Sequence, residues 1–556
     1  MDRFDLGRHR RPVSTKSDRA QFWFDMGLNW CYGFNQEEGV KCFLRALEHD
    51  PGCVMAHWGA AYGQGPFYNN TWRQHLKAEA DATAAFCTGH IEAARAAADR
   101  ATPLENGLVE ALARRFQKPH SATGAEYDQW DEDYAAAMRR VYHAHPGDLD
   151  VAALFAEAIM TRTPWKLWNQ QTGLPPADAD TFEALAVLEH AIARCDADGM
   201  PHHPAILHLH IHATEMSKQP ERALRSADML GTLCPDAGHM NHMPAHTYAL
   251  CGLYEKAKAA SEKAIRADEM YLNYAGPCNF YTTARCHDLH MMMHSCMMMG
   301  QFTPAWAAAC RIRETLGPDV LMYKGPCQTA TTMEGYYAMA PHVLVRFGRW
   351  QQIIDMPLPD DPVLYPVAIP MQHYARVVAH AALKQFDRAE AALTAFYDSR
   401  KRIPEERTFF NNDARAILAV GESMALGELD YHRGNHAAAY DHLREAVRRN
   451  DALAYSEPWP WMHPPRHALA ALLAEQGHFD EAEQVCRDDL GLSDAVPRCA
   501  QHSGNIWALH GFVECLRARG DTAERPEFEA RLARAMTLTD VPVTSACMCR
   551  AASGCC

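Results

Sequence analysis

The chain has 556 residues, of which 48% are hydrophobic and 22% are charged, a composition typical of a folded globular protein. Its formal net charge of −15 argues against nucleic acid as the main partner, and it has no apolar run of the roughly 18 residues that a membrane span requires. The N-terminus is charged and lacks the apolar core of a secretory signal. We therefore expect a cytoplasmic protein whose 19 cysteines are mostly reduced thiols.

The first predicted element is a helical hairpin. Small residues let its two helices approach closely, bulky residues fill the gaps, and a proline stops the second helix. The positions that follow this 34-residue tetratricopeptide pattern are Trp23, Gly27, Trp30, Gly39, Phe43, Ala46 and Pro51.

A turn signature between the two helices of a hairpin, Gly-x-aromatic-x-x-Ala, recurs further along the chain. It appears at Gly252, Gly300, Gly348 and Gly477, with looser copies at Gln385 and Gly434. The steps exceed 34 residues, and the Pro-rich breaks between hairpins do not resemble flexible linkers. The sequence therefore predicts an all-α, right-handed solenoid of helical hairpins over residues 18–535. An N-terminal extension (1–17) precedes it, and a Cys-rich tail (536–556) follows.

Three stretches of the predicted array place histidines on one helical face, because residues at i, i+3, i+4 and i+7 line up on a helix. By position relative to the turns, each stretch lies on the first helix of its hairpin, which lines the concave surface of a tetratricopeptide superhelix. We expect the three helices to direct these side chains into one groove. The aligned residues are His208, His212 and Glu215; His239, His242 and His246; and His287, His290 and His294. His210 is expected to point away.

Such a supply of imidazoles fits one metal ion or two, and imidazole suits zinc, copper, iron and nickel. The Met-rich run at 291–299 beside Cys286 slightly favours copper over iron or zinc, although the same methionines suit a hydrophobic core. Glu215 is the candidate ligand or catalytic base, and Glu157 is a second catalytic candidate. The candidate substrate contacts are Trp165, Glu457, Trp461, Arg466 and His510.

The C-terminal tail carries two close cysteine pairs, Cys547 with Cys549 and Cys555 with Cys556. On a short, mobile end such pairs are suited to soft-metal capture or to thiol–disulfide chemistry. Lipidation is disfavoured because the terminal residues lack the C-a-a-X order.

Several phrases of the chain resemble a family of tetratricopeptide-repeat proteins that includes the tetratricopeptide-repeat-protein-38-like group. They include Phe34-Asn35, Met55 to Gly59, Pro164 to Trp168, Gly238 to His246 and Pro465-Arg466. The resemblance implies repeat architecture and a polar groove. Gln36 and Cys286 depart from it, as do the Met-rich run and the Cys tail.

Three functions remain open at this stage. The first is a metal-dependent enzyme acting on a small molecule or peptide in the groove, by oxidation if the metal is copper or by hydrolysis if it is zinc. The second is a scaffold that binds a peptide. The third is a soft-metal carrier that uses the Met-rich helix and the Cys tail.

Overall fold

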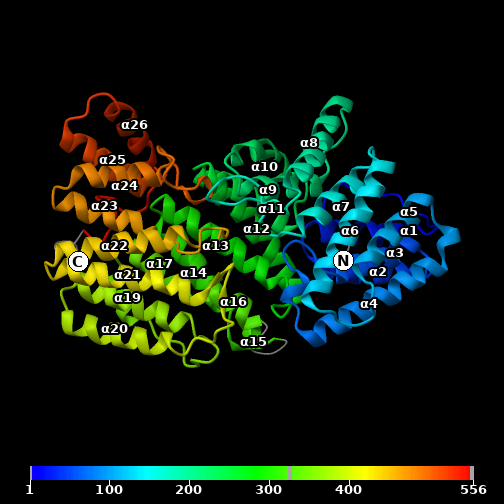
Figure 1. Ribbon diagram of the computed structural model, residues 1–556, viewed down its shortest axis with the longest axis horizontal. Coiled ribbons are helices and arrows are strands. Elements are labelled where there is room, and N and C mark those ends of the chain that lie inside the picture. Colours follow the sequence, from blue (N-terminus) through cyan, green and yellow to red (C-terminus); the bar gives the residue numbers. More distant parts are fainter. Residues whose placement is uncertain (1–2, 324–328, 551–556) are drawn as a thin grey trace. The chain divides into compact units, whose positions relative to one another are not determined.

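The computed structural model describes residues 3–323 and 329–550, and within these ranges the chain is built almost wholly of helices (Figure 1). The one sheet in the described ranges is a two-stranded antiparallel ribbon of β1 (Thr408–Phe409) and β2 (Asn412–Asp413). The predicted all-α array of helical hairpins is confirmed. Its right-handed sense stays a prediction, as do the boundaries at residues 18 and 535.

The chain divides into two compact units, Met1–Thr247 with Lys263–Tyr281 and Tyr248–Glu262 with Thr282–Cys556. Neighbouring helices of the first unit pack in chain order, as α1 does on α2 and α2 on α3. The elements up to the division are α1 (Asp18–Tyr32), α2 (Gln36–His49), α3 (Val54–Gln64), η1 (Trp72–Gln74), α4 (Lys77–Ala96), η2 (Ala98–Arg100), α5 (Pro103–Leu112), η3 (Ala113–Arg115), α6 (Gly124–Ala144), α7 (Leu149–Met160), α8 (Thr181–Asp198), α9 (Pro204–Glu215), η4 (Pro220–Ala223), α10 (Leu224–Leu230), α11 (Gly238–Leu250) and α12 (Tyr254–Ala275).

The second unit also contains helical hairpins, with α19 packed on α20 and α21 on α22 (Figure 1). Its remaining elements are α13 (Thr282–Met298), α14 (Phe302–Thr315), α15 (Pro318–Leu321), α16 (Thr329–Tyr337), α17 (Ala340–Arg346), α18 (Trp350–Asp355), α19 (Ala368–Ala382), α20 (Phe386–Arg400), α21 (Ala414–His432), α22 (His436–Asp451), α23 (Pro465–Glu475), α24 (Phe479–Asp489), η5 (Arg498–Ala500), α25 (Ile506–Arg519) and α26 (Arg525–Met536).

The hairpin turns depend on one residue with left-handed backbone geometry between the two helices. The predicted turn glycines have φ values of +71° at Gly252, +72° at Gly300, +61° at Gly348, +86° at Gly434 and +81° at Gly477. Glycine adopts this conformation without the steric cost that a Cβ atom imposes. The turn signature predicted from the sequence is therefore confirmed at these positions.

The predicted N-terminal hairpin is α1 and α2, and its core is the Phe43 ring. Phe43 is fully buried, and a Cβ atom on Gly27 of α1 or on Gly59 of α3 would lie 2.8 Å or 2.5 Å from it. The two glycines therefore leave the space that the ring occupies. Residues before the hairpin also pack on it, since the rings of Phe4 and Trp30 lie 5.3 Å apart.

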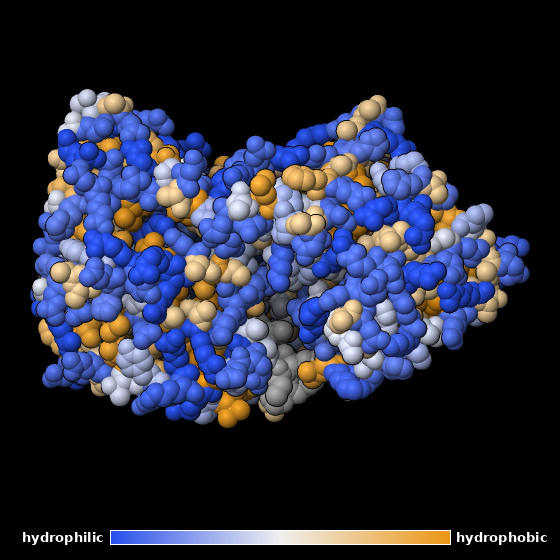
Figure 2. Space-filling model, viewed as in Figure 1, coloured by the Kyte–Doolittle hydropathy of each residue, from blue (hydrophilic) through white to orange (hydrophobic). Residues whose placement is uncertain are grey.

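No helix in the described part of the chain is both long and apolar enough to cross a membrane. On the face shown in Figure 2, hydrophilic residues predominate and hydrophobic residues occur in small scattered groups.

We expect Gly59→Ala to lower the stability of the chain by about 1–3 kcal/mol, because the new methyl group overlaps the buried Phe43 ring. The matched control is Gly89→Ala within α4, where a Cβ atom meets nothing within 4 Å. That change should stabilise the protein by about 0.5–1 kcal/mol through helix propensity. Urea unfolding followed by circular dichroism measures both. Equal effects of the two substitutions would contradict the packing role of Gly59.

Candidate metal centre

The first predicted histidine stretch lies on α9, a helix whose residues are all buried. Pro204 occupies its first turn, where a missing amide N–H costs nothing. His208 and His212 lie one turn apart on the same face. His210 faces elsewhere, as predicted, and its Nδ1 lies 2.9 Å from Ser226 Oγ.

Three imidazoles of the first unit converge in its interior. His208, His212 and His239 each offer one ring nitrogen, these nitrogens lie within 4.8 Å of one another, and all three residues are buried. Nitrogens bound to one transition-metal ion at about 2.0–2.1 Å lie within about 4 Å of each other, so small side-chain movements bring the set to ligand geometry. The set is enclosed in the protein interior, whereas the sequence predicted the wall of an open groove.

The backbone fixes the tautomer of His208. Its Nδ1 lies 2.8 Å from the carbonyl oxygen of Tyr32, and because a carbonyl only accepts, Nδ1 carries the proton. Nε2 has no hydrogen-bond partner among the described residues. Burial, and then the neighbouring His212, hold the pKa of His208 well below its usual value. The ring is therefore neutral with Nε2 available as a ligand.

Glu215 bridges the two histidine helices of the first unit. Its Oε1 accepts a hydrogen bond from His212 Nδ1 and its Oε2 accepts one from His246 Nδ1, both at 2.8 Å. Burial by itself raises the pKa of Glu215, but the two imidazoles lower it below its usual value, so the carboxylate is ionised. A carboxylate behind the Nδ1–H of a ligand histidine orients the ring and raises its basicity, and His212 Nε2 has no hydrogen-bond partner among the described residues.

His242 and His246 form a separate pair on α11. Their Nε2 atoms lie 2.7 Å apart. Because the His246 proton is on Nδ1, facing Glu215, its Nε2 accepts and His242 Nε2 donates. The structure thus divides the predicted ligands of the first unit into a converging set of three and a hydrogen-bonded pair.

Aromatic rings that sequence reasoning missed enclose the set. The Phe34 ring centroid lies 4.4 Å from that of His208 and 5.2 Å from that of His239. Phe34 has a φ of +56°, an uncommon value for a residue with a side chain, and it stands in the turn between α1 and α2. Tyr68 lies 4.9 Å from the His212 ring and 5.3 Å from Trp165, so the predicted substrate contact Trp165 is one ring away.

A second set of polar groups in this unit was also missed, and its centre is a carboxylate that accepts several hydrogen bonds. His9, Asp150 and His203 place their ligand atoms together. Asp150 Oδ1 accepts from His9 at 2.9 Å, from His203 at 3.1 Å and from the Tyr32 hydroxyl at 2.7 Å, and Arg11 bonds to Oδ2 at 3.1 Å. Through these contacts, the segment that precedes α1 is bonded to Asp150 of α7.

The third predicted histidine stretch lies on α13 in the second unit. His287 is half-buried, and His290 and His294 are buried. His290 Nε2 lies 2.9 Å from Met462 Sδ, and its ring stacks on Phe410 at 5.1 Å. The methionines of this helix are buried, as expected of core residues. A ligand role for the three histidines stays a prediction.

The remaining predicted site residues have partners of their own. Glu157 Oε2 accepts from the Tyr62 hydroxyl at 3.3 Å, and burial raises the pKa of Glu157. Arg466 donates two hydrogen bonds to Asp451, at 2.6 and 2.7 Å. Trp461 is fully buried, with its ring 4.5 Å from His342.

Two predicted contacts are less enclosed than Trp461. Glu457 is half-buried and precedes Pro458 in a cis peptide bond. His510 on α25 is also half-buried, and burial lowers its pKa. Their roles stay predictions.

The expectation of a mobile cysteine tail is wrong for Cys547 and Cys549, which are each 1% exposed. They pack inside the second unit and are free thiols. Cys555 and Cys556 lie outside the described residues.

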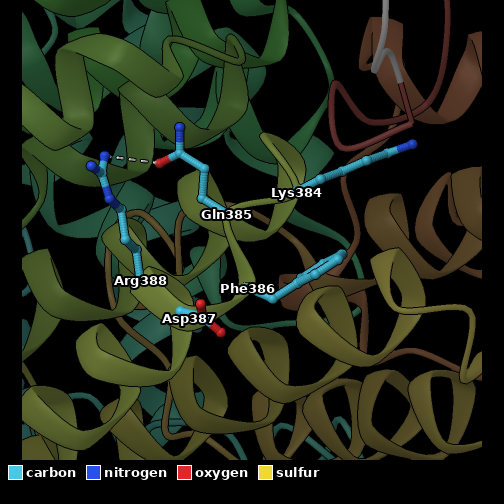
Figure 3. Close-up of a pocket in the computed structure, with 5 residues that line it drawn as sticks. All are labelled: Lys384, Gln385, Phe386, Asp387 and Arg388. Carbon is cyan, nitrogen blue, oxygen red and sulfur yellow. Dashed lines mark hydrogen bonds between the residues drawn. The ribbon is translucent and has the colours of Figure 1, made fainter.

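A surface hollow of about 450 Å³ lies at the turn between α19 and α20 (Figure 3). Its lining runs from Lys384 to Arg388 and includes no predicted site residue. Arg388 donates to Gln385 Oε1 at 3.4 Å across it, so the hollow is a feature of the hairpin turn.

Residues 239–269 match the family model of the tetratricopeptide repeat. They cover α11, the Gly252 turn and much of α12, so the repeat contains His239, His242 and His246. The tetratricopeptide-repeat character predicted from the sequence is thereby confirmed, and the narrower protein-38-like group stays a prediction. A comparison with curated proteins finds no match.

Two solved structures are similar to the chain over most of its length at low identity. One is the human IFIT1 dimer with m7Gppp-AAAA, with 11% identity, 94% of this chain and 91% of that chain covered, and a TM-score of 0.30. The other is yeast Tom70, with 10% identity, 94% and 93% covered, and a TM-score of 0.27. The repeat assignment itself depends on the family match and on the hairpins.

We expect chelator-treated protein to lose stability as the pH falls from 7.5 to 5.5. Burial lowers the pKa of His208 and His246 in the folded state, so the unfolded chain, with histidine pKa values near about 6.5, binds more protons in this range. Each imidazole contributes up to about 1.4 kcal/mol per pH unit. The Glu215 carboxylate acts in the same direction only below about pH 4.5, its unfolded value.

Urea midpoints at several pH values measure this slope. His208→Asn keeps an N–H donor at the position of Nδ1 for the Tyr32 carbonyl but does not titrate, so its slope should be shallower. An unchanged slope would show that His208 is not neutral in the fold.

Proposed function

We propose that the chain is a metal-dependent enzyme whose centre is a transition-metal ion bound by His208, His212 and His239. The observation that carries the proposal is the convergence of three buried ring nitrogens within 4.8 Å. Two of the rings have their Nδ1 atoms fixed, one by the Tyr32 carbonyl and one by Glu215. Isolated core histidines do not need this arrangement, whereas ligand histidines regularly have it.

Three protein ligands suggest a reactive centre more than a structural one, because structural sites are closed by four ligands and catalytic sites leave a position open. Copper or iron bound here would supply one-electron oxidation chemistry, and zinc would supply a water molecule that ionises near neutral pH. Copper-dependent oxidation is the first form of this proposal and zinc-dependent hydrolysis the second, because three imidazoles suit either metal. The Phe34 and Tyr68 rings pack against the histidines and exclude bulk water.

Glu215 is a positioning residue in this proposal. Both of its oxygens accept from histidine Nδ1 atoms, so the carboxylate orients two rings at once. The His242–His246 pair holds a proton between two Nε2 atoms and ends on the same carboxylate. The pair adjoins the proposed centre, since the His242 ring centroid lies 5.9 Å from that of His239, and it can accept or return a proton there.

The second candidate function is a scaffold that binds a peptide, and the repeat match over residues 239–269 favours it. Tetratricopeptide arrays form extended surfaces that suit peptide partners. In that case the buried histidines serve only as a hydrogen-bonded core.

Metal analysis of untagged protein separates these functions. We expect the metal content of the chain to fall by about one transition-metal ion in His208→Ala/His212→Ala relative to the unsubstituted protein. His210→Ala is the matched control, because His210 shares α9 and its burial but bonds to Ser226. Visible and electron paramagnetic resonance spectra identify the metal. Equal metal content in the control and the double variant would favour the scaffold.

Glu215→Gln tests the carboxylate bridge. A neutral amide cannot accept well from both Nδ1–H groups, so the ligand rings lose their fixed orientation and basicity. We expect metal affinity to fall by about 10- to 100-fold, measured by competition with a chromophoric chelator, while the fold is retained by circular dichroism. Unchanged affinity would contradict the positioning role.

A further inference from the structure

Four groups capable of binding a metal meet in the interior of the second unit, well apart in sequence. Glu428, Cys547 and Cys549 place their ligand atoms within 4.8 Å of one another, and all three are buried. His463 joins them, with Nε2 3.8 Å from Cys547 Sγ, and it is fully buried. The groups come from α21, from the segment before α23 and from the segment after α26.

Glu428 is the feature that calls for a ligand. It is 0% exposed, neither of its oxygens has a hydrogen-bond partner of ordinary geometry among the described residues, and the Cys549 thiol lies against the carboxyl group. His432 Nε2 is 3.8 Å from Oε2, too far for a hydrogen bond. An ionised carboxylate buried with only a thiol beside it costs about several kcal/mol unless it takes up a proton or binds a cation. His463 Nδ1 also has no partner within the described ranges.

The surroundings are arranged for negative charge on sulfur. The backbone N–H of Cys549 donates to Cys547 Sγ at 3.3 Å. The Arg346 guanidinium is fully buried, donates to the carbonyl oxygen of Ala546 at 3.4 Å and lies over the Trp507 ring at 4.6 Å. Two thiolates, one carboxylate, one guanidinium and one divalent cation sum to zero charge. A dication can therefore bind here without leaving a net charge in the interior.

We infer that Cys547, Cys549, His463 and Glu428 form a second metal site, closed and four-coordinate, that binds zinc. Two sulfurs, one imidazole and one carboxylate are ligands that zinc accepts, whereas magnesium and calcium require oxygen alone. Four protein ligands leave no open position, so the ion is structural. It fastens the segment after α26 to α21 and to the segment before α23. The site is independent of the histidine centre in the first unit.

The background for the test is full-length His208→Ala/His212→Ala, in which the first-unit centre is removed. Purified under reducing conditions with zinc supplied, this protein should retain about one zinc ion per chain by mass spectrometry of the elements. Adding Cys547→Ser/Cys549→Ser should remove it, and adding Cys515→Ser, another buried thiol of this unit, should not. Zinc that survives the Cys547/Cys549 change, or its absence from the background protein, overturns the inference.

A measurement without cysteine variants guards against misfolding. Cobalt(II) exchanged into the background protein should show thiolate-to-metal charge-transfer absorption and the intense visible bands of tetrahedral coordination. X-ray absorption of the zinc form should show sulfur at about 2.3 Å. A spectrum with oxygen and nitrogen neighbours alone, or a disulfide between Cys547 and Cys549 in the freshly purified protein, would refute the site.

Discussion

The Glu215 carboxylate is the group on which the candidate centre depends. Its two oxygens each accept from an Nδ1–H, one on α9 and one on α11, and so fix two rings through one buried charge. Without the carboxylate, His212 and His246 would each lose the acceptor that fixes the orientation of the ring. The cost of burying this carboxylate is offset because both hydrogen bonds are charge-assisted. A stable core and an oriented ligand set are thus consequences of the same contact.

Sequence periodicity was sufficient to find the histidine helices and the face of α9 that carries the candidate ligands. The i, i+4 spacing placed His208 and His212 together and turned His210 away, and the turn glycines marked the hairpins. Periodicity fails where a contact depends on the backbone or on tertiary structure. The Tyr32 carbonyl that fixes His208 carries no side-chain signal, and Phe34 reaches the histidines only through a left-handed turn residue.

The sequence was an equally limited guide to the surroundings of the C-terminal tail and of α13. Small residues and paired thiols at a chain end suggested mobility. In the structure, Cys547 and Cys549 are instead buried inside the second unit, beside Glu428 from a distant segment. The burial of Glu428 and His463 cannot be read from their neighbours in sequence. Likewise His290 has the spacing of a ligand, yet the nearest group to its Nε2 within the second unit is the sulfur of Met462, contributed 172 residues later.

The two hydrogen bonds of Tyr32 affect the order in which the helices of the first unit can pack. Its hydroxyl bonds to Asp150 on α7, and its carbonyl oxygen accepts from His208, 176 residues further along the chain. During synthesis, the end of α1 therefore stays incomplete until α9 has emerged and packed. His208 in turn has no fixed tautomer until α1 is in place. A nascent chain that ends before α9 therefore carries the N-terminal hairpin but lacks the imidazole that donates to the Tyr32 carbonyl.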